Sequence, residues 1–260
     1  GRYYTRAAKL AGLNELAREQ GADLASLMRQ SGLDPVVRNS PETLIDYGAF
    51  CRLLSLCALK WDMPDVGLRM VRFQQIDFLG PVALVTRMEG TVRGALNAIT
   101  ANLVIHSNAT VVALDETGDT ASIILSQRDD APKGRENTEL VVAQGKLVMD
   151  TILKIPNPLI EVTFVHNKGP SAAAVAKHFG CPVRYGAERN ALVVDRALLE
   201  QRTERSDQAY HALIKRYLSS LRNEVGDGMP EDVRLEIAKQ MELGACTLQS
   251  VAEALRVAPH

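Results

Sequence analysis

The 260-residue chain carries 30 Lys plus Arg against 31 Asp plus Glu, and 46% of its residues are hydrophobic. These proportions are typical of a folded globular protein and exclude a long disordered or collagen-like chain. The net charge of -1 predicts no strong general attraction to nucleic acid or membranes, so any such binding has to be local. The length allows one large domain or two modest ones.

The four cysteines, Cys51, Cys57, Cys181 and Cys246, form no CxxC pair and lie among apolar residues. We expect buried free thiols in a reducing cytosol, not disulfides or metal ligands. The sequence also shows no stretch of about twenty apolar residues and no signal peptide. Together these features predict a cytoplasmic protein that has no membrane partner.

The first hundred residues are mostly helical in pattern. Apolar residues at helical spacing predict a first helix over residues 7–17 and a second, short one over 24–29. Ser40-Pro41-Glu42 have the order of an N-cap, a first-turn proline and an early acid, so we expect a helix from there to Trp61. Thr91 is expected to cap another helix, which continues to Leu103.

The period then changes from helix to strand. Segments 109–115 and 120–126 flank a short polar turn that contains Gly118, which predicts a β-hairpin. Apolar residues from Leu140 to Ile152 predict a longer helix that ends before Pro156.

A second group of strands follows that helix. Residues 160–164 alternate as a half-buried strand, 171–179 predict a helix, and two short strands surround Val183 and Val193. Asn190, between these strands, is expected in a left-handed turn. The predicted fold class is therefore α+β: a helix-rich N-terminal half, then a small mixed sheet with helices, then an all-α C-terminal segment.

The polar, aperiodic run 201–207 suits a domain boundary. We expect one domain over residues 1–200, a linker helix within 201–230, and a further segment over 231–260. In that last segment, Thr247 is a good N-cap for a helix, and a tight turn precedes Pro259. This spacing alone also fits an αα-hairpin of any helical domain.

The run from Val233 to His260, which includes TLQSVAEALRVAP, resembles the first helix-turn-helix of the AraC family of bacterial transcription regulators. It departs from the family at Ala258, where a serine cap is usual. In that family a recognition helix, a linking helix and a second helix-turn-helix follow, so the resemblance implies a truncated DNA-binding domain. Thr247, Arg256 and His260 are the expected DNA-contacting residues, and promoter DNA is expected as a partner of the intact protein only.

Three passages of the larger part carry a second resemblance: FLGPVALVTRMEGTVRGAL at 78–96, FGCPVRYGAERNALVVD at 179–195, and the pattern Val162, Phe164, His166. They resemble the N-terminal sensor domain of the AraC subfamily that includes ornithine-utilisation and virulence regulators. The label arabinose-binding, sometimes given to this domain type, does not identify a ligand. The resemblance implies a transcription regulator whose sensor and dimerisation portion controls promoter binding in response to a small-molecule effector.

Catalytic signatures are missing from the sequence. There is no GxSxG, HExxH, P-loop or Rossmann glycine pattern, and the five histidines are not spaced as metal ligands. We therefore expect no enzyme, no catalytic residue, no metal and no cofactor.

A sensor pocket needs an apolar cavity and a few convergent polar groups, and the densest supply of both lies between residues 61 and 108. Each polar residue there is, on its own, more typical of a solvated or capping position. His106 also raises an alternative, a haem-based gas or redox sensor in which it is an axial ligand, although no Cys-x-x-Cys-His motif is present. The predicted ligand-binding residues are Trp61, Arg72, Phe78, Asn97, Asn102 and His106.

The helix expected over residues 207–221 carries an apolar stripe. Such a stripe either packs on its own domain or, because regulators of this family resemble ligand-controlled dimers, buries itself against a second copy. The predicted dimerisation residues are Tyr210, Leu213, Ile214, Tyr217 and Leu218.

Overall fold

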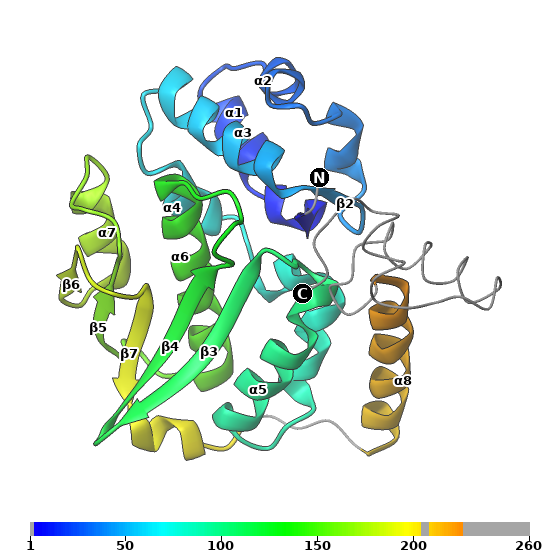
Figure 1. The fold of residues 1–260 in the computed structure, drawn as a ribbon, viewed down its shortest axis with the longest axis vertical. Helices are drawn as coiled ribbons and strands as arrows, with labels where there is room; N and C mark the ends of the chain where they lie inside the picture. Colours follow the sequence, from blue (N-terminus) through cyan, green and yellow to red (C-terminus); the bar gives the residue numbers. More distant parts are fainter. Residues whose placement is uncertain (1–2, 204–207, 226–260) are drawn as a thin grey trace, which may run out of the picture.

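The computed structural model describes residues 3–203 and 208–225, which form an α+β fold (Figure 1). A helix-rich first half is followed by a mixed sheet, as the sequence predicts. The segment 231–260 lies outside the described residues, and with it the predicted DNA contacts Thr247, Arg256 and His260.

Short strands and helices alternate in the first half of the chain, with η marking a 3-10 helix. In order they are β1 (Tyr4–Arg6), η1 (Ala7–Leu10), α1 (Leu13–Glu19), α2 (Leu24–Ser31), η2 (Pro35–Asn39), β2 (Leu44–Asp46), α3 (Tyr47–Lys60), α4 (Val66–Val71), η3 (Ile76–Arg87), α5 (Val92–Asn102) and η4 (Leu103–Ile105).

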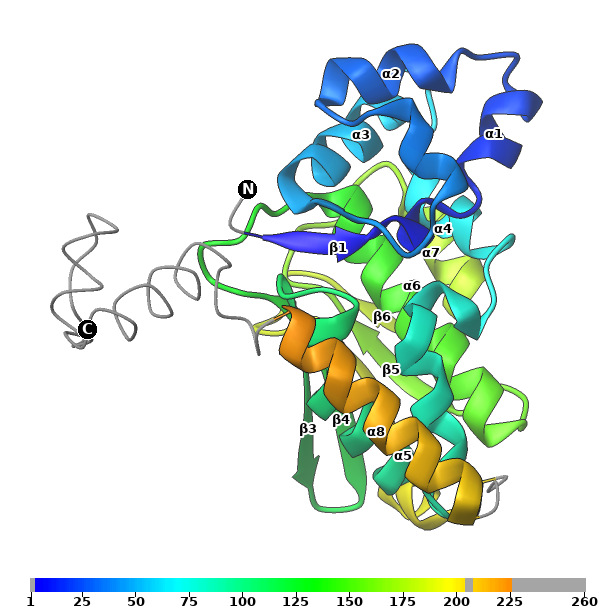
Figure 2. The same cartoon turned by 90° about the vertical axis from the view of Figure 1, so that its right-hand side faces the viewer.

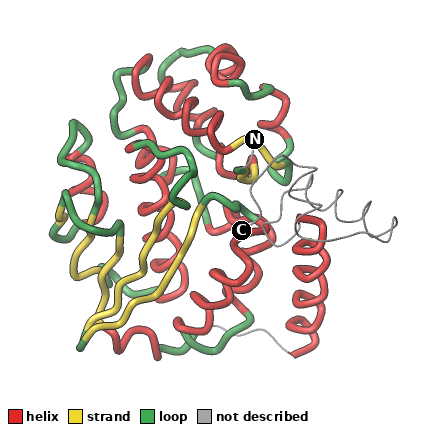
Figure 3. The backbone as a smooth tube through the Cα atoms, in the orientation of Figure 1, coloured by secondary structure: helices red, strands yellow, loops and turns green. Residues whose placement is uncertain are grey.

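The second half contains the five-stranded sheet, drawn in yellow in Figure 3. Its order is β3-β4-β7-β5-β6, in which β5 and β6 are parallel and the other neighbours antiparallel. The elements are β3 (Thr110–Thr117), β4 (Thr120–Gln127), α6 (Arg135–Leu153), β5 (Leu159–Thr163), α7 (Ala172–Phe179), β6 (Val183–Arg184), β7 (Ala191–Asp195), η5 (Arg196–Glu200) and α8 (Gln208–Val225).

One face of the sheet packs on α6. Alternate residues of β4 are buried, as a half-covered strand requires, and Gly145 of α6 lies over them. A Cβ atom on Gly145 would lie only 2.7 Å from Leu125 Cδ1, so the glycine permits the close approach of helix and sheet. The predicted hairpin is confirmed: Thr117 pairs with Thr120, and Gly118 between them has φ +58°.

The helix predicted over residues 7–17 is wrong as a single element. The structure has the short η1, then Gly12 with φ +96°, then α1. A Cβ atom at Gly12 would lie 2.6 Å from the carbonyl oxygen of Met70. Close contact with α4 therefore breaks the helix, and no local pattern in 7–17 reports that contact.

The helix predicted to open at Ser40 is also wrong, because α3 begins at Tyr47. Its N-cap is Asp46, whose side chain accepts a hydrogen bond of 2.6 Å from the Ala49 N–H. The preceding residues pair instead with β1, with Thr5 opposite Ile45. This non-local strand pairing overrides the capping signal at Ser40-Pro41-Glu42.

Asn190 does not have the predicted left-handed backbone. Its side chain is buried, and its Oδ1 accepts a hydrogen bond of 2.9 Å from the Val165 N–H. The asparagine therefore joins the end of β5 to the start of β7 through its side chain.

The helix α8 packs on the rest of the chain, against η3 and η4 (Figure 2). Ile214 and Leu218 are each only 3% exposed and belong to the main hydrophobic core. Tyr217, on another side of the helix, is 47% exposed. One part of the predicted dimerisation stripe is thus used within the chain, and another part is free to contact solvent.

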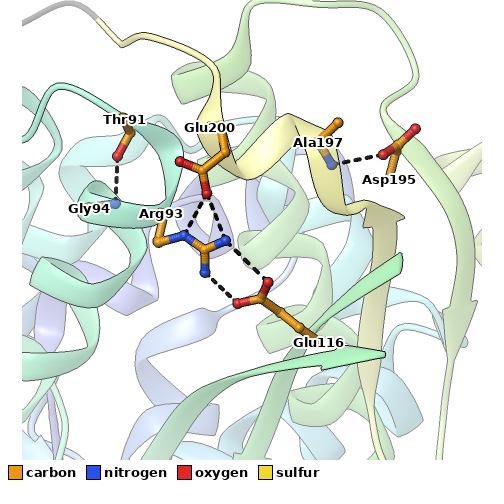
Figure 4. A network of polar contacts seen from close by, with 7 residues as sticks. All are labelled: Thr91, Arg93, Gly94, Glu116, Asp195, Ala197 and Glu200. Atoms are coloured by element: carbon orange, nitrogen blue, oxygen red, sulfur yellow. Dashed lines mark hydrogen bonds and ion pairs between the residues drawn. The ribbon is translucent and has the colours of Figure 1, made fainter. Parts of the chain in front are cut away.

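A network of charged side chains joins α5, β3 and η5 near the end of β3 (Figure 4). Arg93 of α5 donates hydrogen bonds to Glu116 of β3, 3.1 Å from Nη2 to Oε2, and to Glu200 of η5, 2.8 Å from Nε to Oε1. The hydrogen bond from Arg93 lowers the pKa of the Glu116 carboxyl.

Thr91 caps α5 as predicted, accepting a hydrogen bond of 3.1 Å from the Gly94 N–H.

Replacing Arg93 tests what this network contributes. We expect Arg93→Met to lower the melting temperature near neutral pH, because it leaves two carboxylates without their cation. A depressed pKa stabilises the fold above the pKa of the unfolded side chain, about 4.3, and the stabilisation is lost as pH falls through the folded pKa. The difference between wild type and variant should therefore fade below about pH 4 in calorimetric scans.

Arg216→Met, at an exposed position of α8, is the matched control and should leave the melting temperature nearly unchanged. A difference for Arg93→Met that persists undiminished in acid would show that Arg93 acts through packing and not through charge.

Candidate functional site

Two of the six predicted ligand-binding residues meet at a cavity. Phe78 comes from η3 and His106 follows η4, and both line it. Their rings are 5.9 Å apart between centroids and nearly perpendicular, an edge-to-face contact.

The other four predicted residues lie away from this cavity. Asn97 is exposed on α5, and the Asn102 amide donates to the carbonyl oxygen of Ala98 at 2.8 Å within the same helix. Trp61 is the half-buried C-cap of α3. Arg72 is exposed, with a guanidinium nitrogen 3.6 Å from a carboxylate oxygen of Glu19. Their roles in ligand binding stay predictions.

The cavity has a volume of about 60 Å³ and lies between the sheet and the helices α5 and α6. Most of its wall is apolar, which follows from the inward faces of the amphipathic elements around it. Of the described residues, four with polar side chains also line it: Lys9, His106, Thr110 and Gln144. Representative apolar lining residues are Leu96, Ile99, Val112, Ile123, Val141 and Val148.

The backbone around η1 places Lys9 at this cavity. The Arg6 N–H donates to the carbonyl oxygen of His106 at 2.8 Å, and the next residue, Ala7, donates to Thr43 at 2.8 Å. Behind Lys9, the Gln74 amide donates to the carbonyl oxygen of Ala11 at 2.8 Å. The lysine side chain is thereby held inside the domain and is only 1% exposed.

The Lys9 ammonium has aromatic neighbours and no counter-ion among the described residues. Its Nζ lies 5.3 Å from the ring centroid of Tyr47 and 5.3 Å from that of Phe50, the range of cation–π contacts. No carboxylate in residues 3–203 or 208–225 pairs with it. Burial lowers its pKa to about 8, because an ammonium loses its hydration inside the protein.

His106 is the second buried polar group of the cavity. It is 3% exposed, and its Nδ1 has no hydrogen-bond partner among the described residues. Burial lowers the pKa of the imidazole to about 3, with further lowering by the cations of Lys9 and Arg6. The ring is therefore neutral near pH 7.

The neighbouring polar groups are already engaged within the chain. Arg6 donates from Nε to the carbonyl oxygen of Ile105 at 2.7 Å and from Nη1 to Glu42. Gln144 donates to the Oε1 of Gln74 at 2.8 Å. Among the described groups at the cavity, Lys9 has no carboxylate partner and His106 Nδ1 has no hydrogen-bond partner, so both are available to a bound molecule.

This arrangement suits binding, and it does not fit the haem alternative. A volume of about 60 Å³ is far below the roughly 300–1,000 Å³ of pockets that hold drug-sized ligands. A haem is larger than most such ligands, so His106 does not face a space that would accept one.

Sequence reasoning missed Lys9 and Gln144. In a continuous helix over 7–17, Lys9 would lie one turn before Leu13, at the edge of the apolar stripe, where its long side chain could reach solvent. The break at Gly12 turns it inward instead. The only available signal was one charged residue within the apolar run Ala7-Ala8-Lys9-Leu10-Ala11.

A second buried polar cluster lies beside α7. The Ser171 hydroxyl donates to Glu139 Oε1 at 2.6 Å, and His166 Nε2 lies 3.7 Å from the same oxygen. Burial raises the pKa of Glu139 to about 7. Since Ser171 donates to the carboxylate and not to the imidazole, the cluster lacks the serine–histidine pair of a nucleophile and its base.

Residues 3–203 and 208–225 contain no group of three or more His, Cys, Asp or Glu side chains placed to hold a metal ion. None of the described helices has the length and apolar character needed to cross a membrane. Cys51, Cys57 and Cys181 are free thiols, and Cys246 lies outside the described residues.

Comparisons with known proteins all find similarity to transcription regulators. Residues 21–203 match the family model described as the arabinose-binding domain of AraC transcription regulators, at their N-terminus. The match contains the sheet, α5 and α6, and begins after Lys9.

The chain is 27% identical to the HTH-type transcriptional regulator VirS of Mycobacterium tuberculosis, over 98% of this chain and 76% of the relative. VirS sequences of two strains, CDC 1551 / Oshkosh and ATCC 25618 / H37Rv, match equally. The crystal structure of the transcriptional regulator CdpR from Pseudomonas aeruginosa aligns with a TM-score of 0.56. That alignment covers 91% of this chain and 74% of CdpR at 18% identity, which shows a shared fold.

The unpaired ammonium should cost stability. We expect Lys9→Met to raise the free energy of unfolding at neutral pH, by on the order of 3 kcal/mol at most, because methionine keeps the apolar stem and removes the buried charge. The folded pKa is lowered, so this cost is fully present below about pH 8 and is relieved as pH rises toward about 10.5. Urea denaturation near pH 7 and near pH 10 measures both values.

Lys60→Met, at the exposed end of α3, is the control and should change stability little at either pH. A Lys9→Met variant that is less stable than wild type near neutral pH would mean that the aromatic rings more than compensate for the lost hydration.

Proposed function

Because the chain belongs to the AraC transcription regulators that carry the arabinose-binding-type N-terminal domain, we propose that residues 1–200 sense a small-molecule effector and thereby control promoter binding. The observation that carries this proposal is the apolar cavity with Lys9 and His106 at its wall. It lies among η3, α5, the sheet and α6, all within the matched region. An effector acts by binding one arrangement of these elements more tightly than another.

The rest of the proposed organisation rests on the sequence resemblance. Residues 201–230 form the linker, to which α8 belongs, and 231–260 form the start of a helix-turn-helix DNA-binding domain. Promoter DNA is then the partner of the intact regulator, which acts in the cytoplasm, where bacterial promoters lie. The names of VirS and CdpR as transcriptional regulators support this assignment.

We further propose a homodimer that uses the outer side of α8. Ile214 and Leu218 are buried against the chain itself, so they are not free to contact a second copy. Tyr217 is exposed, and a large aromatic side chain is typical of interface anchors. The side chains of Tyr210 and Leu213 lie outside the described part. In a two-fold dimer both copies use the same surface, so Tyr217 of each copy would contribute to the interface.

A larger side chain in the cavity tests whether an effector binds there. Val148 lines it from α6, and we expect Val148→Phe to occupy the space that an effector needs. The substitution is made in the intact regulator, with reporters fused to promoters that chromatin immunoprecipitation identifies. The change in reporter expression that a change of carbon source causes in wild type should fall about tenfold or more in the variant. Promoter occupancy should persist, because the DNA-binding segment is unaltered.

Val111→Phe, at a partly exposed position of β3, introduces the same ring outside the cavity and should respond like wild type. An unchanged response of Val148→Phe would place effector sensing elsewhere. Failure to find any occupied promoter would contradict the DNA-binding assignment itself.

The dimer is tested by sedimentation velocity of the 260-residue chain. We expect Tyr217→Glu to shift the dimer toward monomer, since it places a charge in a two-fold interface. Ser219→Glu, at another exposed position of α8, is the control. Wild-type protein that sediments as a monomer at every concentration would refute the dimer.

A further inference from the structure

The cavity contains one positive charge that the described residues do not balance. Among the described residues, Lys9 Nζ has the rings of Tyr47 and Phe50 beside it and no carboxylate partner. Removing a charge from water costs several kcal/mol unless another charge or hydrogen bonds compensate for it. A bound anion would supply that compensation.

None of the other described ionisable groups around Lys9 is available to balance its charge near neutral pH. Burial raises the pKa of the Cys51 thiol to about 11 and also raises the pKa of Tyr47, so both are neutral. His106 is neutral because its pKa is lowered to about 3. The guanidinium of Arg6 is already bound to Glu42.

We propose that the effector is a small aliphatic monocarboxylic acid, whose carboxylate pairs with Lys9 and whose hydrocarbon part lies against the apolar wall of the cavity. This inference rests on the proposed sensor function and names its ligand class. The neutral His106 ring, which has no hydrogen-bond partner at Nδ1 in the described part, lies at the same cavity and offers a second contact to the carboxylate.

The hydrogen-bond donors and cations at the cavity limit how much negative charge a bound ligand can carry. A phosphate group carries up to two charges and three oxygens, which require several cations or N–H donors. Within the described part of the chain, Lys9 is the one cation that lines the cavity, and the nearby Arg6 guanidinium already donates hydrogen bonds to Glu42 and to the carbonyl oxygen of Ile105. One negative charge is therefore matched, and a second would stay buried without a partner.

The cavity wall sets the rest of the ligand. Leu96, Ile99, Val112 and Val148 provide no hydrogen-bonding side-chain group, so hydroxylated molecules such as sugars would leave polar atoms unsatisfied. A volume of about 60 Å³ favours a short chain, and the flexible Met149 side chain allows modest widening.

Comparing each acid with its amide, which has nearly the same shape and no charge, measures how much the charge of the ligand contributes to affinity. Butyrate, hexanoate and octanoate, each beside its neutral amide, are titrated by calorimetry into the 260-residue chain near neutral pH. We expect at least one acid to bind about tenfold or more tightly than its amide. Lys9→Met should remove this preference by lowering the affinity for the acid to about that of its amide, whereas Lys60→Met should behave as wild type.

Proton uptake gives a second readout that does not require a folded variant. Because burial lowers the pKa of Lys9, part of the empty protein is uncharged at this lysine above neutral pH, and pairing with a carboxylate favours the charged form. Binding of an acid should then take up a fraction of a proton that grows as pH rises from 7 to 9, seen as a dependence of the heat on buffer ionisation enthalpy. Binding of an amide should take up none.

Equal affinity for acid and amide, proton-neutral binding of the acid, or no binding of any acid at millimolar concentration would each overturn the proposed ligand class. The proposed sensor function fails separately, when Val148→Phe leaves the transcriptional response intact. A response that Val148→Phe abolishes and Lys9→Met preserves would retain the sensor and reject the carboxylic acid.

Discussion

The backbone hydrogen bond from the Arg6 N–H to the His106 carbonyl oxygen, 2.8 Å long, joins the start of the chain to the end of the α5–η4 segment. Around it, β1 pairs with β2, and the Arg6 side chain reaches the carbonyl oxygen of Ile105. These contacts hold η1 beside the cavity between the sheet, α5 and α6. Without these contacts, the position of Lys9 relative to His106 would be undefined, because 97 positions separate them in the sequence.

The cavity concentrates groups that do not contribute to stability. A buried ammonium without a counter-ion and an imidazole held neutral both oppose folding relative to apolar residues of the same size. The surrounding core, including the contact of Gly145 with Leu125, is densely packed. Buried, uncompensated groups within an otherwise consistent core are expected at functional sites, where a ligand completes the interactions.

The sequence predicted those elements whose signals are local. The hairpin at Gly118, the cap of α5 at Thr91 and the end of α7 at Gly180, which has φ +64°, each depend on residues within a few positions. The start of α3 was missed because β2 pairs with β1 across about forty residues. The site residues also differ in whether a local or a distant signal identifies them. Phe78 and His106 were identified within one segment rich in apolar and polar residues, whereas Lys9 depends on a distant contact at Gly12.

The position of α8 connects the cavity to the linker. This helix packs against η3 and η4, the segments that supply Phe78 and Leu103 to the cavity wall. Ile214 and Leu218 form the buried side of that contact. In the proposed function, a ligand that widens the cavity displaces the surface on which α8 rests. Since close-packed interfaces shift between discrete arrangements and do not deform continuously, a small displacement at Phe78 is able to change how α8, and the segment that follows it, is held.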